Sequence, residues 1–125
     1  MPHVKTLSVI GCGSAARTLV RLWQDAGVFR IGGILNSRPE SAREAAAFIG
    51  SGTAIAAIEE LPLSDLYLIG CPDDSIGECC IQLAGSNLVT EGTVVFHLSG
   101  ALASSELEPV RHKGASVASV HPVMS

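Results

Sequence analysis

The chain has 125 residues, of which 47% are apolar and 16% are charged, so it can bury a substantial core and lacks the composition of a disordered protein. Its 8 basic and 12 acidic side chains give a formal net charge of -4, and aromatic residues make up 4%. Nucleic-acid-binding domains are usually basic and often carry aromatic stacking platforms. We therefore expect one domain and no nucleic-acid partner.

No membrane-spanning segment is expected, although the mean hydropathy is +0.40. A spanning helix needs roughly 20 mostly apolar residues, and the uncharged stretch Gly92–Ser105 is shorter and contains His97. The first residues lead directly into a strand-like run, without the pattern of a secretory signal. The four cysteines lack C-x-x-C spacing, which favours a reduced, cytoplasmic protein.

Short β-rich runs alternate with helical periods along the chain, as a parallel α/β sheet requires. The near-continuous apolar content of these runs indicates strands that are buried on both faces. The predicted fold is a doubly wound parallel sheet of about six strands in three α/β/α layers. In chain order we predict a strand at 4–10, a helix at 14–26, a strand at 29–35, a helix at 39–50, strands at 53–57 and 66–70, a helix after Pro72, a strand at 94–98, a short helix at 104–112 and a strand at 116–120.

The ends of two helices carry local signals. Gly27 and Gly50 are typical residues just past a helix. The helix that ends at Gly50 is predicted to begin near Pro39–Ser41, where Ser41 and Glu44 have the spacing of a capping box.

Residues 11–16 fit the pattern G-x-G-x-x-[GA] between a predicted strand and a predicted helix, which is the context that this motif needs. The first glycine permits a sharp turn, the second lets a diphosphate approach the backbone, and the final alanine lets the helix pack on the strand. The N–H groups and the positive end of the helix dipole would hold the phosphates. The alternative is an ordinary glycine-rich turn. Cofactor contacts are predicted for Gly11, Cys12, Gly13, Ser14, Ala15 and Ala16.

The tripeptide Asn36-Ser37-Arg38 follows the second predicted strand, about 20 residues past the glycine motif. An NAD site usually has Asp or Glu there to bind the ribose 2′-hydroxyl. An acid would repel a 2′-phosphate, whereas Arg38 can pair with one and Asn36 and Ser37 can donate hydrogen bonds. The sequence therefore predicts NADP over NAD, and the alternative is that Arg38 is a solvated loop residue.

Residues 71–75, Cys-Pro-Asp-Asp-Ser, follow the fourth predicted strand at the carboxyl edge of the sheet, where ligands bind in open α/β folds. The backbone of this loop is expected to line the cofactor. Ser75 and Glu78 have capping-box spacing, so the acids are predicted as helix caps rather than catalysts. The predicted cofactor contacts in this loop are Cys71, Pro72, Asp73 and Ser75.

Two histidines fall at the same predicted edge. His97 ends the fifth strand, with Ser99 just beyond it, and His121 follows the sixth strand. Either histidine could donate a proton or bind a substrate carboxylate or carbonyl, and Ser99 could bond the substrate or the nicotinamide amide. An equally weighted alternative makes His97 a core residue. No metal site is predicted, because His97, His121 and Asp73 lack metal-ligand spacing.

All four cysteines are predicted as small buried residues rather than redox centres. Cys12 holds the variable position of the glycine motif, and Cys79 and Cys80 fall on an apolar helix face.

Together these segments resemble the Rossmann-like N-terminal domain of a family of predicted NADP-dependent oxidoreductases with a C-terminal helical domain of unknown function. The layout is similar to that of the cofactor domains of pyrroline-5-carboxylate reductase, prephenate dehydrogenase, 6-phosphogluconate dehydrogenase and other β-hydroxyacid dehydrogenases. The segments that carry the resemblance are Gly11–Ala16, Asn36–Arg38, Pro72–Ile76, His97–Ala101 and Ser119–Pro122.

The resemblance implies a protein that uses NADP for hydride transfer to or from a small carbonyl, imine or hydroxyacid substrate. It places the Pro72 loop along the cofactor and the Ser99–Gly100 loop near the nicotinamide, and it implies a homodimer formed through the helical domain. That domain is expected after His121–Pro122, so residues 1–125 are expected to be the NADP-binding domain alone. The alternatives are a non-catalytic regulatory module and, more weakly, a site for a flavin or a nucleotide sugar.

Overall fold

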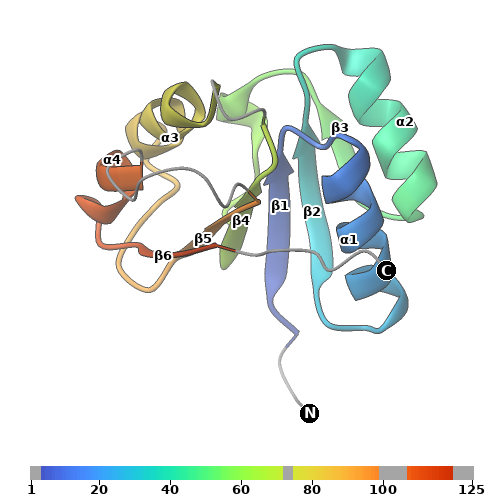
Figure 1. Ribbon diagram of the computed structural model, residues 1–125, viewed down its shortest axis with the longest axis horizontal. Helices are drawn as coiled ribbons and strands as arrows, with labels where there is room; N and C mark the ends of the chain where they lie inside the picture. The colour runs from blue at the N-terminus through green and yellow to red at the C-terminus, as the bar shows by residue number, and fades with distance from the viewer. Residues whose placement is uncertain (1–3, 72–74, 99–106, 120–125) are drawn as a thin grey trace.

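The computed structural model describes residues 4–71, 75–98 and 107–119. These residues form a parallel six-stranded sheet in the order β3-β2-β1-β4-β5-β6, with helices on both faces (Figure 1). The strands are β1 (Thr6–Ile10), β2 (Arg30–Leu35), β3 (Thr53–Ile55), β4 (Leu66–Ile69), β5 (Val94–His97) and β6 (Ser116–Ser119). The helices are α1 (Ser14–Asp25), α2 (Pro39–Ile49), the 3-10 turn η1 (Ile58–Glu60), α3 (Ile76–Gly85) and α4 (Glu108–Arg111).

The predicted fold class is confirmed, and each predicted strand is present with both ends within two residues of its expected bounds. The helix predicted at 104–112 is seen as α4, and the first part of that range lies outside the described residues. Among the described helices, none is long and apolar enough to cross a membrane.

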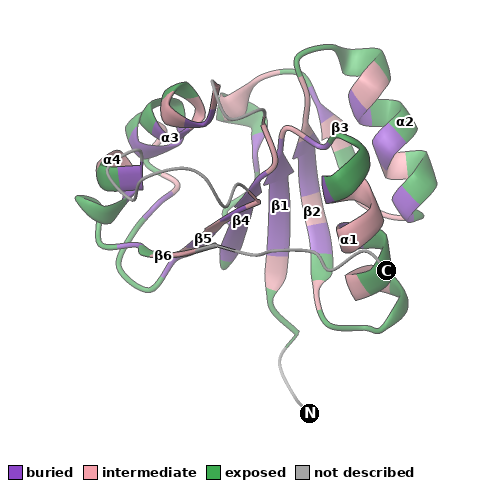
Figure 2. Ribbon diagram, viewed as in Figure 1, coloured by how far each residue is buried: buried purple, intermediate pink, exposed green. Residues whose placement is uncertain are grey.

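Two apolar cores lie on opposite faces of the sheet, and β4 contributes to both because its side chains alternate in direction. Leu66 and Leu68 pack with α1 and α2, whereas Tyr67 and Ile69 pack with α3 and α4. All four side chains are buried (Figure 2). This two-sided burial explains why the central strands read as continuous apolar runs in the sequence.

The predicted capping box of α2 is wrong. The helix begins at Pro39, with Arg38 at the N-cap and no side-chain cap, so Ser41 lies inside the first turn. Proline suits the first helical position because its φ is already helical and it has no N–H to leave unbonded. Ser75 does hold the N-cap position of α3, but its side chain makes no capping hydrogen bond.

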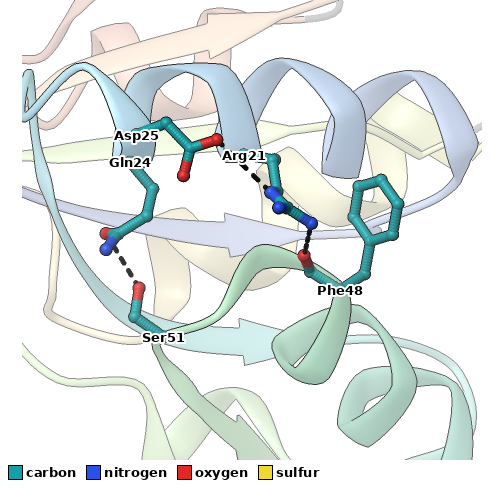
Figure 3. Close-up of polar contacts among 5 residues, drawn as sticks. All are labelled: Arg21, Gln24, Asp25, Phe48 and Ser51. Carbon is teal, nitrogen blue, oxygen red and sulfur yellow. Dashed lines mark hydrogen bonds and ion pairs between the residues drawn. The ribbon is translucent and has the colours of Figure 1, made fainter.

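Polar contacts join α1 and α2 near their C-terminal ends (Figure 3). The Arg21 guanidinium donates through Nη1 to the carbonyl oxygen of Phe48 at 2.8 Å and lies over the Phe48 ring. Ser51 donates through its hydroxyl to the Gln24 side-chain oxygen at 2.9 Å. These contacts tie the C-terminal half of α1 to the end of α2 and to Ser51 just beyond it.

Candidate cofactor site

A cavity of about 840 Å³ opens at the carboxyl ends of β1, β2 and β4. The chain passes from β1 to β2 on one side, while β4 lies on the other side of β1, so this is the point where the strand order reverses. Open α/β sheets bind their ligands in the crevice that forms at such a switch point. The cavity has the size of a small-molecule site.

Gly11 makes the turn out of β1 in a conformation that other residues rarely adopt. Its φ is +78°, and its N–H donates to the carbonyl oxygen of Leu35 at 2.7 Å. A Cβ at this position would lie 2.6 Å from the Sγ of Cys71 and 2.7 Å from its backbone nitrogen. Glycine is therefore required at residue 11 by the backbone and by its neighbour alike.

Gly13 differs from Gly11, because neither its backbone conformation nor its neighbours require a glycine. Its φ of -81° is open to any residue, and a Cβ built there would meet no atom within 4 Å. The residue lines the cavity and forms the N-cap of α1, which has no side-chain cap. The absence of a side chain leaves the Gly13 backbone open to the cavity.

The first turn of α1 presents backbone N–H groups to that space. Arg17 donates to the carbonyl oxygen of Gly13 at 2.9 Å, which is the first bond of the helix. The N–H groups of Ser14, Ala15 and Ala16 precede that bond and have no carbonyl within the helix to pair with. N–H groups of this kind, together with the positive end of the helix dipole, are suited to holding an anion, which is the role that the sequence analysis expects of the glycine motif.

Gly70 is a residue of this site that the sequence analysis missed. A Cβ there would overlap the carbonyl oxygen of Gly11 and lie 2.8 Å from the Cβ of Ala16, which is itself buried. The end of β4 thus passes directly beneath the glycine turn. The available signal was a glycine placed immediately after the buried run 66–69.

Asn36 connects the end of β2 to the glycine turn. Its Oδ1 accepts from the N–H of Cys12 at 2.5 Å, and its Nδ2 donates to the Cys12 carbonyl oxygen at 3.3 Å and to the Ser41 hydroxyl at 2.9 Å. The sequence analysis expects these amide hydrogens to serve a 2′-phosphate, whereas in the structure they hold the loop and α2. Asn36 is therefore a positioning residue for the glycine turn.

The other two residues of the predicted specificity loop are exposed. Ser37 lines the cavity, and Arg38 lies beside it at the N-cap of α2 without being part of the wall. A third segment, Ala56-Ala57-Ile58 after β3, closes this side of the cavity with apolar side chains. The sequence analysis missed this segment, because three small or aliphatic residues carry no functional signal in a sequence.

Cys12 is held as a neutral thiol in the middle of the glycine turn. Its side chain is 3% exposed, and burial raises the pKa of the thiol to about 11, with the charge of Arg17 acting in the opposite direction. At neutral pH it adds no negative charge beneath a bound phosphate.

The predicted residues beyond β4 and β5 are placed only in part. Cys71 and Ser75 line the cavity. Pro72, Asp73, Ser99 and His121 lie outside the described residues. His97 is 5% exposed at the end of β5 and is not part of the cavity wall.

A doubly wound parallel sheet with a glycine turn and an uncapped helix at its switch point defines a nucleotide-binding α/β domain of the Rossmann type. The family model of a Rossmann-like domain matches residues 5–122, so the chain belongs to that family. No curated protein matches the sequence.

Solved structures of the same fold include several nicotinamide-dependent enzymes by name. A predicted NADP oxidoreductase from Bacteroides fragilis aligns with a TM-score of 0.70 at 15% identity, over 94% of this chain and 60% of its own. Pyrroline-5-carboxylate reductase from Coxiella burnetii aligns with a TM-score of 0.75 at 17% identity, over 92% of this chain and 43% of its own. Quinate dehydrogenase from Corynebacterium glutamicum, solved in complex with NAD, aligns with a TM-score of 0.65 at 12% identity, over 92% of this chain and 44% of its own. At these identities the likeness shows the fold, and the chain spans 60% or less of each of these proteins.

Proposed function

We propose that this chain binds NADP and serves as the cofactor-binding domain of an oxidoreductase. The observation that carries the proposal is Gly13, where open space above the backbone faces the cavity at the N-terminus of α1. A diphosphate bound there would accept hydrogen bonds from the backbone N–H groups of the first helical turn. The nicotinamide group supplies hydride transfer, and the protein supplies its binding and orientation.

The two halves of the cavity suit the two halves of a dinucleotide. Ala56, Ala57 and Ile58 form an apolar wall on the β2–β3 side, where a flat adenine ring would lie. On the β4 side the cavity is lined by Cys71, by Ser75 and by Cys79 of α3. That side would face the nicotinamide.

The choice of NADP depends on the end of β2, which has no acid to bind a free ribose 2′-hydroxyl. Ser37 and Arg38 are exposed there, so a hydroxyl and a guanidinium are available for a 2′-phosphate. Because the amide of Asn36 is engaged by the protein, we assign the phosphate contact to Ser37 and Arg38.

The class of reaction is proposed by analogy with the neighbours named above. They support a small carbonyl, imine or hydroxyacid as the substrate, converted by the full-length protein. Failure of that protein to turn over any such substrate, despite tight NADPH binding, would favour the regulatory module instead.

The decisive experiment compares two glycine-to-alanine variants by NADPH fluorescence titration. Gly13→Ala is expected to fold normally, because its backbone conformation suits alanine, and to lose NADPH affinity at least tenfold. Gly85→Ala is the matched control: a Cβ there also meets nothing within 4 Å, but the residue lies at the end of α3, away from the cavity wall. Equal affinities of the two variants, or no binding of NADPH to the wild type, would refute the proposed site.

A further inference from the structure

Two cysteines of the cavity wall face each other across the connection from β4 to α3. Cys71 directly follows β4, Cys79 lies in the first half of α3, and their Sγ atoms are 2.6 Å apart. All four cysteines are described, and none forms a disulfide. Cys12 and Cys80 are buried, as the sequence analysis expected, whereas Cys71 and Cys79 are only half-buried.

We propose that Cys71 and Cys79 form a reversible dithiol–disulfide site in the wall of the cavity, with a hydroperoxide as the oxidant. This inference goes beyond the proposed cofactor function and does not depend on it.

The geometry favours a bond within the chain. A disulfide is about 2.05 Å long, so the two sulfur atoms need to approach by only about half an ångström. Both are held by anchored elements: Cys71 directly follows β4, with its Sγ 3.7 Å from the carbonyl oxygen of Ile10, and α3 is fixed by buried residues that include Ile76 and Leu83. The fold itself therefore brings the two sulfurs together.

The cavity gives a small oxidant access to this pair. Cys71 and Cys79 both line it. Cys12 lines it too, but it is 3% exposed and burial holds its thiol protonated. Reactivity toward peroxide follows exposure and thiolate character, so the pair is the preferred target among the four cysteines.

The hydrogen bond between the two thiols separates their roles. It lowers the pKa of Cys79 and, together with burial, raises the pKa of Cys71. We therefore assign the attack to Cys79 and the resolving step to Cys71, an order that cysteine variants test.

The chemistry balances as two thiols plus one hydrogen peroxide giving one disulfide and two waters. The Cys79 sulfur attacks one peroxide oxygen, the O–O bond breaks, and the departing hydroxide takes up the proton released by the Cys79 thiol, leaving a sulfenic acid. The Cys71 sulfur then attacks the Cys79 sulfur, the S–O bond breaks, and the second hydroxide leaves with the Cys71 proton as water. The sulfur atoms lose two electrons and the peroxide gains them.

Peptide mapping of the folded wild-type protein tests the site. After peroxide treatment and alkylation, a Glu-specific protease cuts after Glu78 and separates the two cysteines. We expect the two peptides to stay joined, the intact mass to fall by two hydrogen atoms, and dithiothreitol to restore both thiols. Alkylated Cys71 and Cys79, a sulfinic acid on Cys79 without a cross-link, or a bond between two chains would overturn the proposal.

Cysteine variants test the pairing and the order of attack. The variant Cys12→Ala/Cys80→Ala retains only the pair and should cross-link as the wild type does, provided that circular dichroism shows it folded. Cys71→Ser should stop at a sulfenic acid on Cys79, which dimedone traps. Trapping on Cys71 in Cys79→Ser, with none on Cys79 in Cys71→Ser, would refute the assigned order.

A last measurement links the pair to the nucleotide, and this step rests on the proposed function. NADP⁺, which cannot act as a reductant, should slow cross-linking at least threefold at saturation, because both sulfurs line the same cavity. Bound NADP⁺ without any slowing would overturn the link. Absence of NADP⁺ binding would refute the proposed function and leave the cross-linking result unaffected.

Discussion

Asn36 and Arg38 lie two positions apart in the sequence, but they have different roles at the end of β2. Arg38 is exposed beside the cavity, whereas the amide of Asn36 is bonded to Cys12 and Ser41. One side chain is available to a ligand, and the other shapes the loop that receives it. Substitutions at the two positions should therefore separate cofactor selectivity from cofactor binding.

Replacing Arg38 with alanine should weaken NADPH binding about tenfold, since a hydrogen bond to a charged group contributes about 1.5 kcal/mol or more. NADH lacks the 2′-phosphate, so its affinity should change less than twofold. Fluorescence titration of both nucleotides at low salt measures the difference. Arg30→Ala, an exposed arginine at the opposite end of β2, is the control and should alter neither affinity. Equal losses for NADPH and NADH would contradict the phosphate role of Arg38.

Two substitutions of Asn36 should have different effects on nucleotide selectivity and on stability. Asn36→Asp retains an oxygen for the Cys12 N–H but places a negative charge where the 2′-phosphate would lie, so it should favour NADH over NADPH. Asn36→Ala leaves the Cys12 N–H without its partner, so both nucleotides should bind more weakly by a similar factor and stability should fall by about 1–3 kcal/mol. Titration and urea unfolding test the two variants. A selective loss of NADPH in the alanine variant would show that Asn36 contacts the phosphate directly.

At the scale of elements, Arg21 is one of several side chains that connect α1 to α2, and it has two unequal partners. Arg21 bonds the carbonyl oxygen of Phe48 and stacks on its ring, and it also pairs with Asp25 at 3.4 Å on the exposed surface of α1. Exposed ion pairs four residues apart contribute little. Arg21→Ala should therefore lower the free energy of unfolding by about 1 kcal/mol, and Asp25→Ala by about 0.3 kcal/mol. Urea denaturation resolves the two, and equal effects would show that the ion pair, not the interhelical contact, dominates.

The strands, their parallel arrangement and the position of the glycine turn were all predictable, because each depends on a local pattern of apolar residues or glycines. The start of α2 was not predictable in the same way. Pro39 and Ser41 each carry a signal for a helix N-terminus, and the local sequence does not show which of the two prevails. The contact of Asn36 with Cys12 joins residues 24 positions apart, and the approach of Gly70 to Gly11 joins two strands. Such contacts exist only after the sheet has formed, so the sequence predicts where the glycine turn lies but not which residues contact it.

For the whole molecule, the cavity borders both apolar cores. Its wall comes from β1, β2 and β4 and from helices on either face, so a nucleotide bound there would touch elements that pack into opposite sides of the sheet. Ligand binding should therefore stabilise the domain as one unit rather than a single loop. A ligand that binds only the folded state adds about 2.7 kcal/mol at roughly 100 times its dissociation constant.

That stabilisation should raise the melting temperature of the domain by about 10 °C, taking about 4 °C per kcal/mol for a chain of this size. Differential scanning fluorimetry with increasing NADPH measures the shift, and circular dichroism at 222 nm checks that the helices melt in the same transition. The Gly85→Ala control should shift as the wild type does, whereas Gly13→Ala, with an affinity at least tenfold weaker, should shift by about 6 °C or less at the same NADPH concentration. A melting temperature that stays constant at millimolar NADPH in the wild type would contradict binding at the switch point. Two separate transitions, with only one moved by NADPH, would show that the two faces of the sheet unfold independently and that the cavity belongs to one of them.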